Sequence, residues 1–201
     1  MQGAYFREAG FNELEPAMKI YDDSFPPEEK QPLNVKLKNI QGNKERLYVA
    51  VTEEGIVAMA LLFSLLDGFD LLDTLAVKRE ERGKGIGTGF VKYLSSMGRQ
   101  LLLEVENPSC GERRDQKKLR VMFYRKNGGK LLANVRYILP PLSGGEPTQM
   151  ILMALTPRST LNGATVRRMI LKIYTELYGL HAENALVQQT LNSVPKEVAL
   201  E

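Results

Sequence analysis

The sequence predicts an α/β protein in which helices cover both faces of a mixed β-sheet. One observation is the short polar link Glu53-Glu54-Gly55 between two apolar runs, which indicates an antiparallel hairpin. Another is that later apolar runs alternate with stretches of helical periodicity, which indicates strand–helix–strand crossovers. A chain that combines hairpins with crossovers is typical of a mixed sheet between layers of helices.

The first half of the chain supplies the hairpin. The expected strands are Tyr5–Glu8, Leu47–Thr52, Ile56–Leu65 and Leu71–Val77, and the expected helices are about Asn12–Ser24 and about Glu28–Ile40. Asn12 can cap the first helix, and Phe25-Pro26-Pro27 ends it because proline cannot continue the hydrogen-bond ladder. Pro32 interrupts the second helix.

The second half alternates helices and strands. The expected helices are Gly85–Gly98 and about Glu112–Lys126, and the expected strands are Leu101–Val105, Leu131–Leu139 and Gln149–Leu155. Asn127-Gly128-Gly129 is a glycine-rich end to the second of these helices. The connector Pro140–Pro147 is too long for a tight turn, so we expect a loop with a docking or functional role.

The tail from Thr160 onward has a helical pattern, and a second short helix is expected over Glu183–Leu191. Its apolar stripe has no partner of its own, so it either packs back on the sheet or forms a homodimer contact. We therefore expect a main domain over residues 1–157 and a helical C-terminal extension over residues 158–201.

Composition excludes several classes of protein. The 201 residues are 43% hydrophobic and 25% charged, which is typical of a globular domain with a real core. The net charge of +3 is too small to predict nucleic-acid binding. The N-terminus lacks a secretory signal pattern, and no apolar run reaches the roughly 18 residues of a membrane span. We expect a cytoplasmic protein that binds neither nucleic acid nor membrane.

The sequence contains few of the cysteine and histidine residues that disulfides and many metal sites require. Cys110 is the one cysteine, which excludes an internal disulfide and a cysteine-rich zinc site. His181 is the one histidine, which argues against a histidine metal site or a Ser-His-Asp triad. We expect His181 to be a surface residue near a helix end, and we expect no metal.

The most informative segment is the turn between the strand Leu71–Val77 and the helix that follows. It contains Arg82-Gly83-Lys84-Gly85-Ile86-Gly87-Thr88. Closely spaced glycines let backbone N–H groups converge, and with the helix N-terminus they form an anion site suited to phosphates. A Walker loop is excluded because no lysine followed by Ser or Thr comes after the last glycine. A dinucleotide fingerprint is excluded because Thr88 and Phe90 stand where its third glycine is needed. The alternative is a turn that only shapes a tight connection.

Arg82-Gly83-Lys84-Gly85-Ile86-Gly87 fits the pattern R-x-x-G-x-G, which resembles the acetyl-coenzyme A signature of the GNAT superfamily of N-acetyltransferases. The strand before it, the next strand ending near Asn107 and the helix carrying Phe123–Gly129 follow in the family's order. The resemblance covers Tyr5 to about Leu155 and implies a mostly antiparallel sheet of about seven strands. The C-terminal tail is not covered by the resemblance.

The resemblance implies how acetyl-coenzyme A would be held. Backbone amides of the turn would bind its diphosphate; these belong to Arg82, Gly83, Lys84, Gly85, Ile86, Gly87 and Thr88. The pantetheine arm would pair with the strand residues Leu75, Ala76 and Val77, and a backbone N–H near Val77 would polarise the thioester carbonyl. Asn107 is a candidate partner of the pantetheine, with a turn before Pro108 as the alternative. Lys84 is preferred for the ribose phosphate over the basic helix start at Arg113.

The resemblance also implies catalytic roles. Tyr124 resembles the tyrosine that protonates the departing thiolate, and core packing is its alternative role. A base must remove a proton from the amine, and Asp73 is the first candidate because it stands in an otherwise apolar strand. Glu104 is the second, and Glu28 and Glu29 are others. Each carboxylate has a structural role as its alternative.

The predicted reaction transfers an acetyl group from acetyl-coenzyme A to a primary amine by direct attack in a ternary complex. The acceptor, a small molecule or a peptide, is unidentified. A route through an acetylated Cys110 is possible, but the family norm needs no nucleophile. Two other readings stay open: a non-catalytic acyl-coenzyme A-binding regulatory module, and an acyltransferase with a longer acyl donor.

Overall fold

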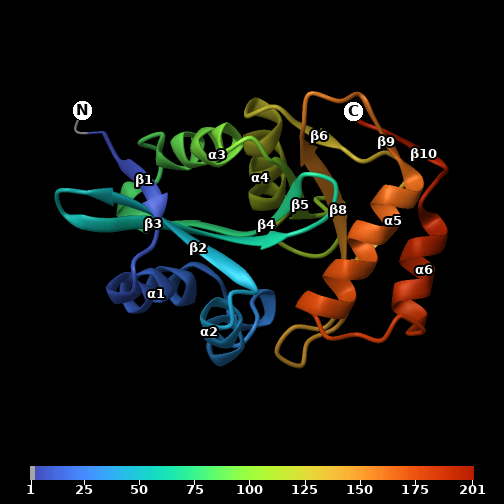
Figure 1. Cartoon of the computed structure of the whole chain (residues 1–201), viewed down its shortest axis with the longest axis horizontal. Coiled ribbons are helices and arrows are strands. Elements are labelled where there is room, and N and C mark those ends of the chain that lie inside the picture. Colours follow the sequence, from blue (N-terminus) through green and yellow to red (C-terminus); the bar gives the residue numbers. More distant parts are fainter. Residues whose placement is uncertain (1–2) are drawn as a thin grey trace. The chain divides into compact units, whose positions relative to one another are not determined.

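The computed structural model describes residues 3–201, apart from the side chains of Phe11 and Glu28 (Figure 1). The chain forms two compact units that interleave along the sequence. Unit 1 comprises Met1–Ser64, Leu72–Arg99 and Leu142–Gly145, and unit 2 comprises Leu65–Leu71, Gln100–Pro141 and Glu146–Glu201. The boundary that the sequence suggests at residue 157 stays a prediction.

Unit 1 contains the predicted hairpin. Its elements are β1 (Tyr5–Glu8), α1 (Leu14–Ser24), α2 (Leu33–Gln41), β2 (Glu45–Thr52), β3 (Gly55–Ser64), most of β4 (Phe69–Val77) and α3 (Ile86–Ser96). The strands lie in the order β1-β2-β3-β4, and β2 is antiparallel to both β1 and β3.

Helices cover both faces of this part of the sheet, as the sequence predicts (Figure 1). On one face, Met18 and Tyr21 of α1 belong to a buried cluster with Val49 and Met59 of the two hairpin strands. On the other face, the ring of Phe6 lies 5.2 Å from that of Phe90 in α3. The alternation of side chains along a strand, together with the 3.6-residue period of the helices, produces this two-sided core.

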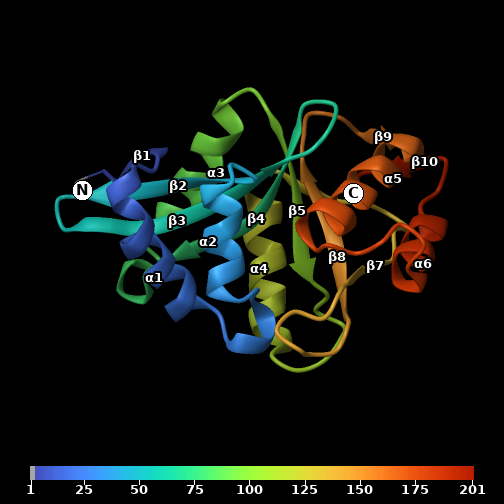
Figure 2. The same cartoon turned by 60° about the horizontal axis from the view of Figure 1, so that its bottom comes forward.

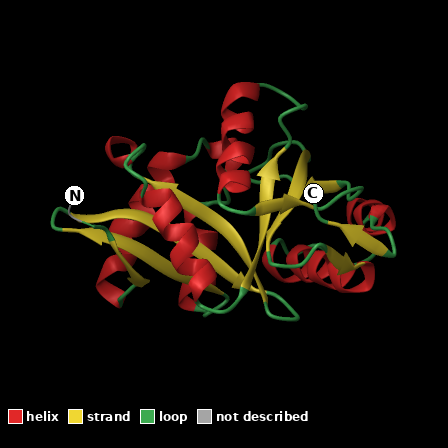
Figure 3. Ribbon diagram, turned by 90° about the horizontal axis from the view of Figure 1, so that it is seen from above, coloured by secondary structure: helices red, strands yellow, loops and turns green. Residues whose placement is uncertain are grey.

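Unit 2 is built around a central strand, β8 (Thr148–Leu155). Antiparallel to it run β5 (Gln100–Glu106), β6 (Gly129–Leu131) and β7 (Tyr137–Leu139). The other elements are α4 (Arg114–Lys126), β9 (Thr160–Asn162), α5 (Gly163–Lys172), a π-helical turn (Ile173–Leu177), α6 (Ala185–Ser193) and β10 (Glu197–Ala199). The fold is thus α/β with a large, mostly antiparallel sheet flanked by helices (Figure 3), so the predicted fold class is confirmed.

Three local predictions are wrong. The single strand predicted over Leu131–Leu139 is broken into β6 and β7, because Asn134 adopts a left-handed conformation with φ 60°. Asn12 does not cap α1; it lies in a short 3₁₀ turn, and Glu13 stands directly before the helix. The predicted helix Glu28–Ile40 forms only from Leu33, after Pro32.

The tail packs back on its own unit, which is one of the two expected alternatives (Figure 2). Its helix α5 buries Val166, Met169 and Ile170. The Tyr174 hydroxyl donates to the backbone oxygen of Ile138 at 2.7 Å, and β9 and β10 pair antiparallel. The tail is therefore an integral layer of unit 2.

Candidate functional site

The glycine turn leads from the end of β4 through a 3₁₀ turn, Arg79–Glu81, into α3. Gly83 and Gly85 have φ values of 81° and 84°, and a Cβ at either position would meet no atom within 4 Å. A side chain would have enough space at both positions. Glycine is favoured there because the backbone is left-handed, a conformation that other residues rarely adopt. Gly85 stands directly before the first residue of α3.

The amides of this turn are open. Within residues 3–201, the backbone N–H groups of Gly83 through Thr88 donate to no backbone oxygen, and no side chain caps α3. The first turn of a helix leaves such donors unpaired at the positive end of its dipole. Converging amides of this kind can bind a phosphate or another anion.

Two cations flank these amides. Lys84 is 58% exposed and pairs with Glu81 at 2.8 Å, and the hydrogen bond to Glu81 raises the pKa of Lys84. The Arg82 side chain donates from Nε to the backbone oxygen of Val77 at 3.1 Å, which ties the turn to the end of β4. These two basic side chains contribute positive potential beside the turn.

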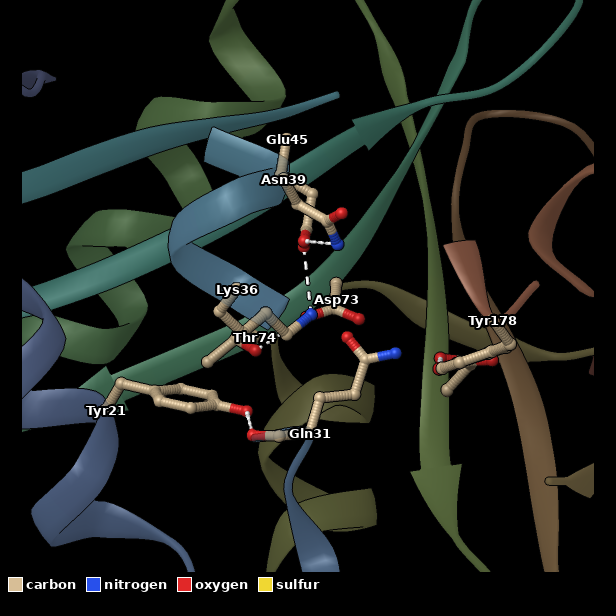
Figure 4. A network of polar contacts seen from close by, with 9 residues as sticks. Tyr21, Gln31, Lys36, Asn39, Glu45, Asp73, Thr74 and Tyr178 are labelled. Atoms are coloured by element: carbon tan, nitrogen blue, oxygen red, sulfur yellow. Dashed lines mark hydrogen bonds and ion pairs between the residues drawn. The ribbon is translucent and has the colours of Figure 1, made fainter. Parts of the chain in front are cut away.

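Asp73 of β4 belongs to a buried ionic network with α2 and β2 (Figure 4). Lys36 Nζ lies 2.6 Å from Asp73 Oδ2 and 3.0 Å from Glu45 Oε1, and Asn39 donates to Glu45 Oε2 at 2.8 Å. The side chains of Lys36, Asp73 and Glu45 are 2%, 7% and 0% exposed. Burial opposes the charge of Lys36, yet Asp73 and Glu45 raise its pKa above the ordinary value.

This network explains why an aspartate stands in an otherwise apolar strand. Asp73 Oδ2 accepts hydrogen bonds from both Lys36 and the Thr74 hydroxyl, at 2.6 and 2.7 Å. Burial and the nearby Asp73 charge raise the pKa of Glu45. One buried lysine therefore serves two carboxylates, and this geometry supports the structural alternative for Asp73.

Glu104 of β5 is held by two tyrosines of unit 2. The Tyr137 hydroxyl donates to Oε1, and the Tyr178 hydroxyl donates to Oε2 at 2.6 Å. Tyr137 is fully buried, and burial followed by the Glu104 charge raises the pKa of Tyr137 well above its ordinary value. Its phenol therefore keeps its proton and acts as a donor.

Sequence reasoning missed both tyrosines. Tyr137 lies 33 residues from Glu104 in the chain and Tyr178 lies 74 residues from it. No local spacing connects positions so far apart, and the predicted tail contained no signal that it would reach β5.

Tyr124 is buried on α4, and burial raises its pKa to about 12. Its ring meets that of Phe123 edge-on at 5.1 Å, so the packing role exists whatever else this residue does. Asn107 Oδ1 accepts from the Ser109 amide at 2.9 Å, and this contact forms the turn that was expected as its alternative role. The binding role of Asn107 stays a prediction.

The predicted residues are divided between the units. Unit 1 contains the glycine turn, the strand residues Leu75–Val77 and Asp73, and unit 2 contains Glu104, Asn107 and Tyr124. The side chain of Glu28 lies outside the described part of the molecule. At the start of α4, Lys117 and Arg120 both pair with Glu106, at 3.7 and 2.5 Å.

Other kinds of site find no support in the part of the chain that the structure describes. Among residues 3–201, no group of three or more His, Cys, Asp or Glu side chains could hold a metal ion. His181 is exposed, as expected. No helix within the same residues is long and apolar enough to cross a membrane.

Comparison with known proteins finds a family model that matches part of the chain. Residues 43–128 match the model of the acetyltransferase (GNAT) domain. This segment includes the hairpin, the glycine turn, β5 and α4, and so the elements on which the sequence resemblance rests. Residues 43–128 are therefore similar to the GNAT acetyltransferase domain, which agrees with the resemblance predicted from the sequence.

Individual proteins that resemble this chain have low sequence identity to it. YjbC of Bacillus subtilis strain 168, named as a candidate acetyltransferase, is 28% identical over 116 residues, which are 58% of this chain and 59% of that protein. A candidate GNAT acetyltransferase from Bacteroides thetaiotaomicron superposes with a TM-score of 0.72 at 23% identity, over 88% of this chain and 99% of its own.

A second solved structure shows the same fold with a ligand. It is a Bacillus subtilis acetyltransferase in complex with CoA, with a TM-score of 0.52 at 14% identity, over 78% of this chain and 100% of its own. At these identities both superpositions establish the fold alone.

Proposed function

We propose that this protein transfers an acetyl group from acetyl-coenzyme A to a primary amine by direct attack in a ternary complex. The single observation that carries the proposal is the set of open backbone amides from Gly83 to Thr88. In a chain with a GNAT domain, a row of unpaired donors at the start of α3 fits the diphosphate of coenzyme A.

The proposed step balances as follows. The base takes one proton from the ammonium group, and the neutral amine attacks the thioester carbonyl carbon. A backbone N–H near Val77 stabilises the developing oxyanion. The C–S bond then breaks, and Tyr124 gives its proton to the thiolate. The nitrogen loses its second proton to solvent, the Tyr124 phenolate takes a proton back from solvent, and the base returns its proton to solvent. Burial raises the pKa of Tyr124 to about 12, so its phenol carries a proton before the step.

Of the two candidate bases, the contacts favour Glu104. Asp73 Oδ2 is already occupied by hydrogen bonds from the buried Lys36 and from the Thr74 hydroxyl. The contacts of Glu104 with Tyr137 and Tyr178 come from neutral hydroxyls, which orient this carboxylate without neutralising its charge. We therefore propose Glu104 as the base and a structural role for Asp73, which reverses the order preferred from the sequence.

Gly85→Ala tests the diphosphate site. A side chain at φ 84° is strained although it meets no atom within 4 Å, so the change disturbs the amides without a clash. Calorimetry should show coenzyme A binding weakened about tenfold or more, since strain of 1–3 kcal/mol must be relieved by moving the turn. Gly55→Ala is the matched control, because Gly55 has φ 103° and equally open space but lies in the β2–β3 hairpin.

The outcomes separate the possible functions. Equal binding by Gly85→Ala and the wild type would show that the turn does not hold coenzyme A. A thioester-consumption assay over amino acids, polyamines, aminoglycosides and peptides then tests transfer. Binding without turnover of any amine would favour a non-catalytic coenzyme A-binding module, and faster turnover of longer thioesters would favour a different acyl donor.

A further inference from the structure

The C-terminal extension reaches the proposed base through one side chain. Tyr178 follows the π-helical turn, and its backbone amide donates to the Ile173 oxygen at 3.1 Å. The next turn is fixed by the Leu180 amide, which donates to the Tyr174 oxygen at 2.9 Å. With its backbone held in this way, Tyr178 places its hydroxyl 2.6 Å from Glu104 Oε2.

The other oxygen of Glu104 is fixed from β7. Tyr137 donates to Oε1, and its ring stacks on Tyr174 with centroids 5.3 Å apart and planes 6° from parallel. The Tyr174 hydroxyl in turn bonds to the Ile138 oxygen and to the Thr190 hydroxyl, at 2.7 and 2.9 Å. Two tyrosines thus define the direction of the carboxylate.

The two hydroxyl contacts differ in surroundings. Tyr137 is fully buried, whereas Tyr178 and Glu104 are half-buried. Oε1 therefore accepts from a donor in the interior, whereas Oε2 accepts from a donor that is partly exposed. A phenol is neutral and donates a single hydrogen bond, so Tyr178 can orient Oε2 without forming an ion pair that would weaken it as a base.

We propose that Tyr178 is a positioning residue that holds the Glu104 carboxylate for removal of the amine proton. The inference rests on the proposed function. It gives the C-terminal extension, which lies outside the matched GNAT segment, a part in the reaction. Without the hydroxyl, the carboxylate loses one of the donors that fix its direction and favour its charged form.

Tyr178→Phe is the test, with Tyr174→Phe as matched control. Both changes remove one hydroxyl from the same tail, but the Tyr174 hydroxyl bonds to Ile138 and Thr190. We expect Tyr178→Phe to lower kcat about tenfold and to move the acidic limb of the kcat/KM profile to higher pH. The dissociation constant of coenzyme A should not change. Tyr174→Phe should keep the wild-type pH profile.

A double-mutant cycle separates positioning from general destabilisation. If Tyr178 acts through Glu104, adding Tyr178→Phe to Glu104→Gln should cause little further loss. Additive losses, an unchanged pH profile in Tyr178→Phe, or equal losses in both tyrosine variants with matching falls in Tm would overturn the positioning role. A wild-type protein that binds coenzyme A but acetylates no amine would overturn the proposed function itself, and this role with it.

Discussion

At the scale of single residues, Lys36 forms two buried ion pairs in unit 1, and we expect both to contribute to the stability of the protein. Lys36→Met would leave Asp73 and Glu45 as buried carboxylates without their cation. We expect a loss of about 3–5 kcal/mol in the free energy of unfolding, because breaking a buried pair strands a charge. Urea denaturation at neutral pH measures this loss.

Lys38→Met is the control, since Lys38 is exposed on the same helix and its loss should cost less than about 0.5 kcal/mol. The pKa of Lys36 is raised above its ordinary 10.5, so the stabilisation is complete below pH 10.5 and is lost as the pH rises through the raised value. Equal effects of the two substitutions would refute the ionic role.

Residue-scale prediction from the sequence is possible where the residues of a site are adjacent in the chain. The turn from Arg82 to Thr88 could be recognised because its glycines and the following helix are adjacent in the chain. The partners of Glu104 could not, because two tyrosines join it only through tertiary packing. The isolated charge of Asp73 in an apolar strand indicated a position with a specific role. Its ion-pair partner Lys36, 37 residues away in the chain, was not predicted.

At the scale of elements, the start of α5 depends on a close backbone approach. A Cβ on Gly163 would lie 1.9 Å from the Pro195 oxygen and 2.7 Å from the Lys196 oxygen, and the Gly163 amide donates to that same Lys196 oxygen at 2.8 Å. Gly163→Ala should therefore separate α5 from the chain before β10 and destabilise the protein by about 1–3 kcal/mol or more. Differential scanning calorimetry measures the change.

Gly145→Ala is the matched control, because a Cβ at Gly145 meets no atom within 4 Å and its φ is not positive. A Gly163→Ala protein as stable as this control would mean that the two segments are not in close contact.

Elements were predictable where periodicity is strong. The β2–β3 hairpin and helices α3 and α4 lie close to the predicted ranges, because their apolar residues repeat at a regular spacing. The short strands β9 and β10 were missed, since three residues give no usable period and their pairing joins Thr160 to Ala199. The break between β6 and β7 was missed, although asparagine, which stands at position 134, adopts the left-handed conformation more often than most residues.

At the scale of the whole molecule, unit 2 should depend on the tail for its integrity. Removing the residues after Pro157 deletes β9, α5, α6 and β10, and with them the Tyr174 ring that stacks on Tyr137. It also removes the backbone pair between Leu131 and Glu201, whose two hydrogen bonds measure 2.6 and 3.0 Å. The fully buried side chain of Tyr137 would then lose part of its cover.

We expect the truncated protein to melt about 10 °C lower or more, because several kcal/mol of packing are lost and each shifts Tm by about 2–4 °C in a chain of this size. Light scattering should show association through the uncovered apolar surface. Glu183→Ala in the intact chain is the control, since Glu183 is exposed. A truncated protein with the Tm and mass of the full chain would contradict an integral tail, whereas a full-length dimer that becomes a stable monomer on truncation would favour the homodimer contact instead.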